Sequence, residues 1–284
     1  MPELPEVETT KASLAPLLDQ QVLSVEVRQS SLRWPIPADL SKLVGQRLIQ
    51  LKRRSKYILA VFEQDTMLWH LGMSGSFRIC EVGETLRKHD HLIIRFEDVE
   101  LRYHDPRRFG CILWLDEYSQ TKLIDTRGPE PLSADFNAEY LSQKLKSKQV
   151  GIKVAIMDNH VVVGVGNIYA TESLFNLGIH PAQVASSLTP SQIEKLVVEI
   201  KRILQQAIDL GGSTLRDYSN AMGENGYFQQ TLLAYGRAGE MCVNCETTLE
   251  NIKLGQRASV FCPECQPLKK VQPKPKATAR GKTK

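Results

Sequence analysis

The chain has 284 residues, of which 42% are hydrophobic and 24% are charged. This length favours two domains, each able to bury a core. No apolar run approaches the roughly 18 residues that span a bilayer. The acidic amino terminus has no apolar segment, which excludes a signal peptide. The sequence therefore predicts a cytoplasmic protein of bacterial type with no membrane partner.

The net charge of +4 is misleading because the last residues dominate it. Residues 266–284 carry seven Lys or Arg and no acid, which leaves 29 basic against 32 acidic groups, or −3, in residues 1–265. A nucleic-acid surface would therefore need local clusters of basic residues. The tail itself is rich in Lys and Pro and has almost nothing to bury, so residues 266–284 are predicted to be disordered.

The amino terminus has two interpretations. Removal of Met1 would leave Pro2 as a secondary amine with a pKa of about 7.7–8.0, followed at once by Glu3, Glu6 and Glu8. An amine beside acids suits covalent acid–base chemistry. The same residues also describe an ordinary helix start, with Pro5 at the first helical position and acids near the positive end of the dipole. On these residues alone the ordinary helix start is favoured.

The residues after this start predict a helix followed by strands. A helix is expected over 3–18, with a buried side made of Leu4, Val7, Leu14, Leu17 and Leu18. Strand patterns follow at 22–27, 57–62, 91–96 and 111–115, with turn signals at 63–65, 72–75 and 97–98. Short strands with frequent turns predict an antiparallel sandwich or barrel of about 115 residues. We therefore expect an N-terminal domain over 1–120.

The pattern changes at Gly128-Pro129-Glu130-Pro131, which predicts a hinge or linker over 121–135. Helices are then expected near 136–147, 152–158 and 167–178. A capping box at Thr189–Gln192 starts the clearest helix, which closes at Gly211-Gly212. Its buried face is predicted to comprise Ile193, Leu196, Val197, Ile200, Leu204 and Ile208. The whole predicts an α+β fold with a helical domain over 136–230 and a hairpin region over 231–265.

Four cysteines in the hairpin region form a candidate metal site. They are two Cys-x-x-Cys pairs with sixteen residues between them: Cys242, Cys245, Cys262 and Cys265. Four thiolates at this spacing suit tetrahedral Zn²⁺ and leave no open position for catalysis. Arg257, near the tip of this hairpin, is well placed for a phosphate, or is simply a solvated surface residue. Cys80 and Cys111 lie in apolar contexts and are interpreted as packing residues.

Basic residues concentrate between Arg47 and Lys56, where five occur without an acid. They form either a strip that follows a phosphate backbone or a solvated strand edge. If Lys56 lies in a strand, it projects opposite to Ser55 and Tyr57 and can face a groove while Tyr57 packs.

Two turn-rich loops carry residues that can enter a base stack. His70–Ser76 has Met73 at its tip, and Asp105–Gly110 sets Arg107 beside Phe109. Such side chains can fill the space that a flipped-out nucleotide leaves. The alternative, which the residues alone favour, is that Met73 and Phe109 anchor their loops to the core.

Two further segments resemble known motifs only in part. His89 and His91 suggest a metal, but no third ligand is apparent. Gly164-Val165-Gly166 lacks the third glycine and the βαβ setting of a dinucleotide fingerprint. A tight turn that presents backbone N–H groups and Asn167 to a phosphate at a helix start fits better.

Together these motifs resemble the formamidopyrimidine-DNA glycosylase family, whose members excise oxidised purines from DNA. The matching segments run in order along nearly the whole chain: 2–9, 53–57, 70–76, 88–91, 105–110, 128–132, 162–173 and the zinc hairpin. The sister endonuclease VIII branch usually begins Pro-Glu-Gly-Pro, so Leu4 and Asp105–Gly110 favour the purine-lesion branch.

The resemblance implies a monomeric enzyme with one structural zinc ion that acts in the bacterial nucleoid on double-stranded DNA with oxidised purines or abasic sites. It implies a helix–two-turn–helix element around 159–169. Pro2 is then the nucleophile, Glu3 its acid–base partner, Lys56 the proton donor in β-elimination, and Arg257 the residue of δ-elimination. Glu6 and Glu172 are assigned to supporting the site. The implied DNA contacts are Met73, His89, Arg107, Phe109, Lys153 and Asn167.

Two departures and two rivals stand beside this interpretation. Gln149 occupies a position where the family often has a DNA-contacting Lys or Arg, and Lys153 or Lys148 is expected to make this phosphate contact instead. The basic tail after Cys265 extends beyond the usual end of the family sequence. The rivals are a non-catalytic zinc-dependent DNA-binding protein and an enzyme of the pyrimidine-lesion branch.

Overall fold

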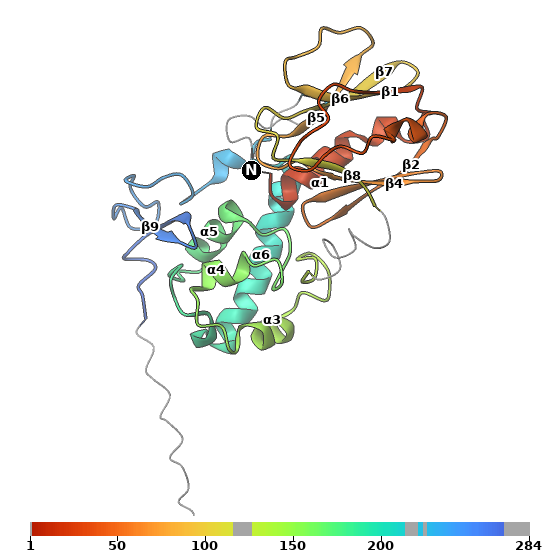
Figure 1. Ribbon diagram of the computed structural model, residues 1–284. Coiled ribbons are helices and arrows are strands. Elements are labelled where there is room, and N and C mark those ends of the chain that lie inside the picture. The colour runs from red at the N-terminus through yellow and green to blue at the C-terminus, as the bar shows by residue number, and fades with distance from the viewer. Residues whose placement is uncertain (1, 116–126, 214–220, 224–225, 270–284) are drawn as a thin grey trace, which may run out of the picture.

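The computed structural model describes residues 2–115, 127–213, 221–223 and 226–269. Figure 1 shows two halves, with antiparallel sheets formed by the N-terminal residues and a group of helices formed by the C-terminal residues. A small hairpin lies beside the helices. The α+β architecture predicted from the sequence is confirmed. The predicted domain boundaries remain predictions, and their parts at 116–126 and 214–220 lie outside the described residues.

The N-terminal half contains two four-stranded antiparallel sheets, ordered β1-β6-β7-β5 and β2-β3-β4-β8. In the core the Phe77 ring packs between the rings of Trp69 and Tyr103. The ring centroids are 4.6 Å apart for Trp69 and Phe77 and 5.1 Å apart for Phe77 and Tyr103, and both pairs are tilted. The strands are β1 (Ser24–Val27), β2 (Leu48–Arg54), β3 (Tyr57–Phe62), β4 (Thr66–His70), β5 (Ser76–Glu81), β6 (Asp90–Arg95), β7 (Val99–His104) and β8 (Cys111–Trp114).

Four of these strands match predicted segments, namely β1, β3, β6 and β8. The other four were not individually predicted because their ends are charged or lie against turns. In β7, for example, Arg102 is only 1% exposed, yet its guanidinium bonds to Glu100 and to the carbonyl oxygens of Glu84 and Thr85. A buried cation satisfied in this way interrupts the apolar pattern without interrupting the strand.

The first helix is shorter than predicted. α1 runs over Leu4–Ser13 and is followed by a 3₁₀ turn at Ala15–Leu17. This change of helix type turns Leu18 outward, where it is 36% exposed, so its predicted burial was wrong. The other four predicted core residues of this segment are buried. α1 packs against β2, β3 and the long helix α6, and so connects the two halves.

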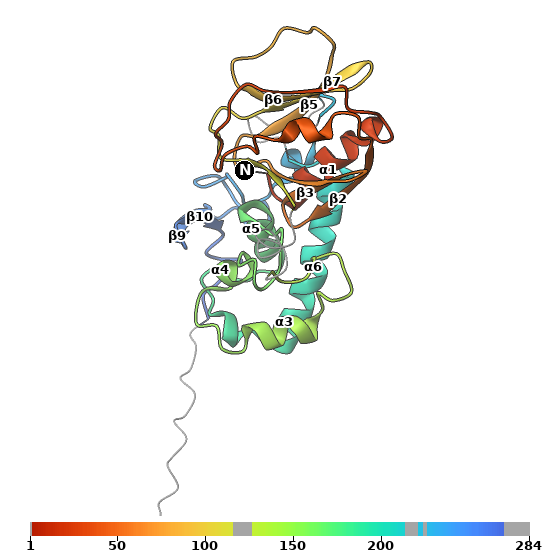
Figure 2. The ribbon, with the colours of Figure 1, turned by 45° about the vertical axis from the view of Figure 1, so that its right-hand side comes forward.

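The C-terminal half contains α3 (Ala138–Leu145), α4 (Ile152–Ile156), α5 (Asn167–Asn176) and α6 (Pro190–Asp209). The predicted capping box is confirmed, because Thr189 and Gln192 each accept the backbone N–H of the other. Most of the predicted face of α6 is buried, together with Ile203 and Ala207, whereas Ile208 is half-buried. The hairpin β9 (Glu250–Leu254) and β10 (Arg257–Phe261) packs against α5, as Figure 2 also shows.

The disordered tail was predicted to begin at residue 266, which is too early. Gln266 is 1% exposed and donates to the carbonyl oxygen of Ile179 at 2.8 Å, and the amide of Lys269 donates to Gln183. Residues 270–284 lie outside the described part of the chain. No helix among the described residues has the length and apolar character needed to cross a membrane.

Candidate active site

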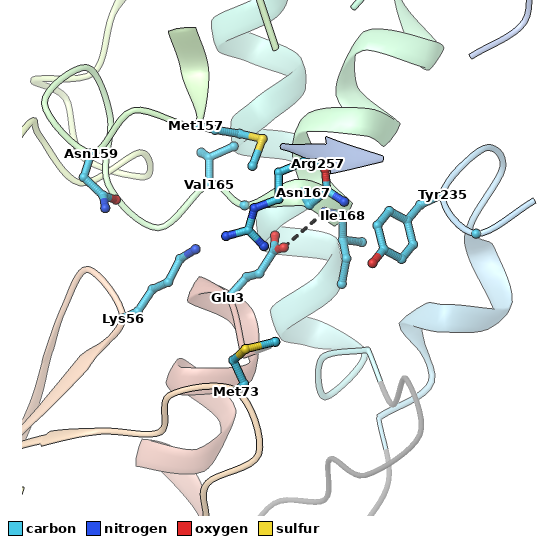
Figure 3. Close-up of a pocket in the computed structure, with 12 residues that line it drawn as sticks. Glu3, Lys56, Met73, Met157, Asn159, Val165, Asn167, Ile168, Tyr235 and Arg257 are labelled. Atoms are coloured by element: carbon cyan, nitrogen blue, oxygen red, sulfur yellow. Dashed lines mark hydrogen bonds between the residues drawn. The ribbon is translucent and has the colours of Figure 1, made fainter. Parts of the chain in front are cut away.

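A cavity of about 580 Å³ lies between the two halves. Figure 3 shows its lining, to which α1, the β2–β3 turn, the loop before α5 and the zinc hairpin all contribute. Its polar and charged lining residues converge from both halves of the chain. The lining comprises Glu3, Lys56, Met73, Met157, Asn159, Val165, Gly166, Asn167, Ile168, Tyr235, Gly236 and Arg257.

Glu3 is held at the base of this cavity by both halves. It caps α1, its backbone N–H donates to Glu6 at 2.8 Å, and its carboxylate accepts the N–H of Ile168 at 3.1 Å. A Cβ on Gly166 would lie 2.1 Å from the Glu3 carboxyl carbon, so Glu3 can keep this position only with glycine there. Burial raises the pKa of Glu3, while the positive charge of Lys56 opposes the rise. A buried carboxyl group with a raised pKa is suited to acid–base work.

Pro2 is buried directly before Glu3. The next residue, Leu4, donates its N–H to the carbonyl oxygen of Gly164 at 3.2 Å. This bond joins the start of the chain to the loop before α5. Pro2 is therefore held next to Glu3, which lines the cavity.

Lys56 reaches the cavity for a different reason from the one predicted. It lies in the two-residue turn between β2 and β3, because Arg54 pairs directly with Tyr57. The alternation expected of a strand is therefore not what directs it. Burial lowers the pKa of Lys56, and the nearby carboxylates of Glu3 and Glu6 oppose this effect. Tyr57 packs inside the sheet as expected, 7% exposed.

The basic residues between Arg47 and Lys56 differ in their surroundings. Arg47 and Lys52 are exposed, and Lys52 lies on the edge strand β2, as the solvated-edge alternative predicts, whereas Arg53 and Arg54 are paired within the protein. Arg53 bonds to Glu8 and Glu130, each at 2.6 Å, and Arg54 bonds to Glu130 at 2.8 Å. Arg54 also donates to the carbonyl oxygen of Gly128 at 2.9 Å. Both guanidinium groups are thus used in contacts within the protein.

The four cysteines that were predicted to bind a metal do form a cluster. The Sγ atoms of Cys242, Cys245, Cys262 and Cys265 all lie within 4.8 Å of one another. Tetrahedral Zn–S bonds of about 2.3 Å place sulfur atoms roughly 3.8 Å apart, and the closer pairs here are separated by 3.3 to 3.9 Å. Backbone N–H groups of Asn244 and Cys265 point at two of the sulfurs. The donor set fits one structural zinc ion.

Arg257 begins β10, directly after the Gly255-Gln256 turn, and its side chain enters the cavity (Figure 3). Lys153 lies beneath the same hairpin. It is 1% exposed, and its ammonium donates to the Ala258 carbonyl at 3.0 Å and to the Ser259 hydroxyl at 2.9 Å. Burial lowers the pKa of Lys153 to about 8. The position predicted to contact phosphate is thus buried against the hairpin that carries Arg257.

The loops with Met73 and Phe109 form one unit at the edge of the cavity. The buried carboxylate of Asp105 accepts from the Ser74 hydroxyl at 2.7 Å and from the Gly110 N–H at 2.9 Å. Met73 and Phe109 are 39% and 45% exposed, so the alternative that they anchor the loops to the core is wrong. The Arg107 guanidinium stacks over the Phe109 ring at 4.8 Å.

The other predicted contacts are dispersed. His89 lies in a shallow depression with Arg28, Lys88 and Arg108, away from the main cavity. Asn167 begins α5 and lines the cavity, but the N–H of Ile168 beside it is taken by Glu3. Gln149 is exposed and donates to Ser186, while Lys148 is paired with Asp158 at 3.0 Å.

Several residues that the site needs were not singled out from the sequence. Met157 and Asn159 line the cavity from the segment directly after α4, and Tyr235 lines it from the loop after residue 231. Glu172, which the resemblance assigned to supporting the site, accepts three consecutive backbone N–H groups, from Leu233 to Tyr235, and so shapes the loop that carries Tyr235. No local pattern marks Tyr235 or Met157, because their places in the cavity arise from contacts between distant segments.

Glu6 supports the same centre from inside α1. Its carboxylate accepts from the Glu3 amide, from the Tyr169 hydroxyl at 2.6 Å, and from the amide and hydroxyl of Ser213. It therefore connects α1, α5 and the residues after α6. Figure 3 shows the outcome, with Glu3, Lys56 and Arg257 directed into a common space.

Comparison with known proteins agrees with this geometry along the chain. Three family models match: the formamidopyrimidine-DNA glycosylase N-terminal domain over residues 1–112, the H2TH domain of the same enzyme over 127–219, and a zinc finger found in FPG and IleRS over 239–268. A formamidopyrimidine-DNA glycosylase of Acinetobacter baumannii is 82% identical, covering 96% of this chain and 99% of its own. One of Acinetobacter baylyi is 79% identical, covering 95% and 100%.

Solved structures show the same arrangement. The Lactococcus lactis FPG mutant G226P in complex with Fapy-dG-containing DNA has a TM-score of 0.87 and 35% identity, covering 94% of this chain and all of that one. The L. lactis enzyme with abasic-site DNA has a TM-score of 0.86 and 36% identity, covering 93% and 99%. Since three family models cover most of the sequence and close relatives span it, the chain belongs to the formamidopyrimidine-DNA glycosylase family.

Proposed function

We propose that this protein removes oxidised purines, such as formamidopyrimidines and 8-oxoguanine, from double-stranded DNA and then cleaves the strand at the abasic site. One observation carries the proposal. Three segments meet at a cavity between the two halves: Glu3, which directly follows the buried Pro2, the Lys56 turn and the Arg257 hairpin. The relatives bear the name of this activity, and the L. lactis structures hold lesion or abasic DNA.

The first step is attack by the Pro2 nitrogen on C1′ of the damaged nucleotide, with departure of the oxidised base. Removal of Met1 supplies this amine. Glu3 protonates the sugar ring oxygen as the ring opens, a role suited to a buried carboxyl group with a raised pKa. The bond between the Pro2 nitrogen and C1′ forms as the base leaves with its electron pair, and the nitrogen then loses its proton. When the bond from C1′ to the protonated ring oxygen breaks, the nitrogen lone pair forms the C=N bond of an iminium ion.

The iminium ion acidifies the C2′ proton, which permits elimination of the 3′ phosphate and then of the 5′ phosphate. Lys56 is assigned as the proton donor in the first elimination, and its position at a hairpin tip directs its ammonium into the cavity. Arg257 is assigned to hold the phosphate during the second elimination. Planar guanidinium groups bind phosphates with paired hydrogen bonds.

The DNA is proposed to lie across the space between the halves, with the lesion flipped into the cavity. Met73, Arg107 and Phe109 project from loops cross-linked through Asp105 and fill the vacated stack. Asn167 and His89 contact phosphates on either side. Lys153 is proposed to act indirectly, because its ammonium is already bound to the hairpin.

Borohydride trapping tests the covalent step. We expect the mature protein to form a reduced adduct with 8-oxoguanine DNA, and Pro2→Gly to lose the adduct and strand cleavage. Equal trapping and cutting by Pro2→Gly would refute the assignment of the nucleophile. DNA binding without any adduct in the wild-type protein would instead favour a non-catalytic binding protein. Parallel assays on thymine-glycol duplexes separate the purine-lesion from the pyrimidine-lesion branch.

A further inference from the structure

The turn that presents Lys56 is held by one carboxylate from outside the sandwich. Glu130 Oε1 accepts the backbone N–H of Ser55 at 2.7 Å and Arg54 Nη1 at 2.8 Å, while Oε2 accepts Arg53 Nη1 at 2.6 Å. Arg53 also donates to the carbonyl oxygen of Ser55 at 2.9 Å. Both backbone polar groups of the residue before Lys56 are therefore fixed by Glu130 or by its ion-pair partner.

This turn needs external support. Ser55 adopts a left-handed conformation with φ of 57°, which is unfavourable for a residue with a Cβ. The buried Ser55 hydroxyl has no hydrogen-bond partner among the described residues. The side chain of Ser55 thus does not stabilise the turn, and the contacts of its backbone with Glu130 and Arg53 do.

Glu130 is itself fixed to the opposite wall of the cavity. Gly128 donates to the Asn159 carbonyl at 2.7 Å, and Pro129 accepts the N–H of Val163 at 3.2 Å. A Cβ on Gly128 would lie 2.6 Å from the Val161 carbonyl oxygen, so the segment lies tightly on this loop. The same loop contributes Asn159 and Val165 to the cavity. Residues 128–130 therefore contact both halves, and the interpretation of 128–131 as a hinge or linker stays a prediction.

We propose that Glu130 is a positioning residue that sets the place of the Lys56 ammonium relative to the helical wall of the cavity. The inference rests on the proposed role of Lys56 in strand cleavage and adds the residue that makes this role possible. Glu130 is not among the residues that line the cavity, and its hydrogen bonds go to Arg53, Arg54 and the backbone of Ser55, so it acts through the Ser55-Lys56 turn. Its effect should therefore appear in elimination, which uses Lys56, and not in formation of the Pro2 adduct.

The test compares Glu130→Gln, Lys56→Ala and the double variant on DNA with a preformed abasic site. Gln keeps the shape but removes the charge that two arginines and an amide share. A displacement of about 1 Å can cost up to roughly 100-fold in rate, so a partial shift should slow single-turnover cleavage about tenfold. Borohydride-trapped adduct should stay within about twofold of wild type. The double variant should cleave no more slowly than Lys56→Ala alone, because coupled residues are not additive.

Glu199→Gln provides the matched control. Glu199 also pairs with an arginine, Arg202 at 2.7 Å, and is similarly shielded, but it lies on α6 away from the cavity. It should leave trapping and cleavage unchanged. Melting temperatures of all variants are measured under the same conditions.

Three outcomes overturn the inference: unchanged cleavage in Glu130→Gln, a parallel loss of trapping and cleavage, or a further loss when Glu130→Gln is added to Lys56→Ala. Failure of the proposed function gives a different result. In that case wild-type protein forms no adduct, or Lys56→Ala cleaves at the wild-type rate, whatever Glu130→Gln does.

Discussion

The two walls of the cavity are built in different ways. The wall from the sandwich presents Glu3, Lys56 and Met73 from a helix cap, a tight turn and a loop, all backed by a large apolar core. The wall from the C-terminal half has two parts. Its helical part, which includes Val165 and Ile168, has a large apolar core of its own, whereas the hairpin that carries Arg257 is backed by a small cluster that includes the metal-binding cysteines. The first wall depends on hydrophobic packing and ion pairs, and the hairpin part of the second depends on zinc.

Zinc removal should separate the walls most clearly. Chelation, or Cys262→Ser, should unfold the hairpin, because structural zinc sites supply the folding free energy of such small units. Strand cleavage should fall by more than about 100-fold as Arg257 loses its position. Trp34, Trp69 and Trp114, the three tryptophans of the chain, all precede residue 115. Their fluorescence should therefore stay unchanged, and a red shift at the same chelator concentration would contradict this division.

Gly166→Ala should disturb the junction of the walls. The new Cβ would overlap the Glu3 carboxyl group, which must move. We expect single-turnover base release to fall about 100-fold, as expected for a displaced acid–base group. Gly83→Ala is the control, because a Cβ there meets nothing within 4 Å, although its φ of 82° makes it somewhat less stable. Normal base release by Gly166→Ala would show that Glu3 does not need its present position.

The stability of the second wall should depend on pH through Lys153. Its folded pKa of about 8 lies below the ordinary value of 10.5. Between these values the unfolded chain binds more protons than the folded one, so stability rises with pH. The free energy of unfolding should increase by about 2 kcal/mol between pH 7.5 and 9.5. Urea titrations of wild type and Lys153→Met check this, and an equal slope in both proteins would refute it.

Met73→Ala should have the smallest effect on folding. Its side chain is 39% exposed, so the free energy of unfolding should change by less than about 0.5 kcal/mol. Affinity for lesion DNA should nevertheless fall several-fold if Met73 enters the base stack. The nearby Leu71 is 1% exposed, and Leu71→Ala should cost about 2–5 kcal/mol of stability. Unchanged DNA affinity in Met73→Ala would remove this residue from the proposed interface.

Features with a local signal could be predicted from the sequence. The capping box of α6 and the two Cys-x-x-Cys pairs each lie within a few residues, and their geometry follows from that spacing. The apolar runs of β3, β6 and β8 were located for the same reason. The strand β7 was missed, because a buried arginine such as Arg102 needs partners that its own segment does not reveal.

The sequence by itself determined the amino-terminal Pro-Glu pair, the zinc ligands and the division into a sheet half and a helical half, since short-range patterns encode each of them. Only the tertiary structure decided which basic side chains are paired within the protein and which line the cavity. Arg53 finds its carboxylates 45 and 77 residues away, and Lys153 finds its acceptors 105 and 106 residues away. The free energy of a charge depends on burial and on its partners, and chain folding alone brings such distant groups together.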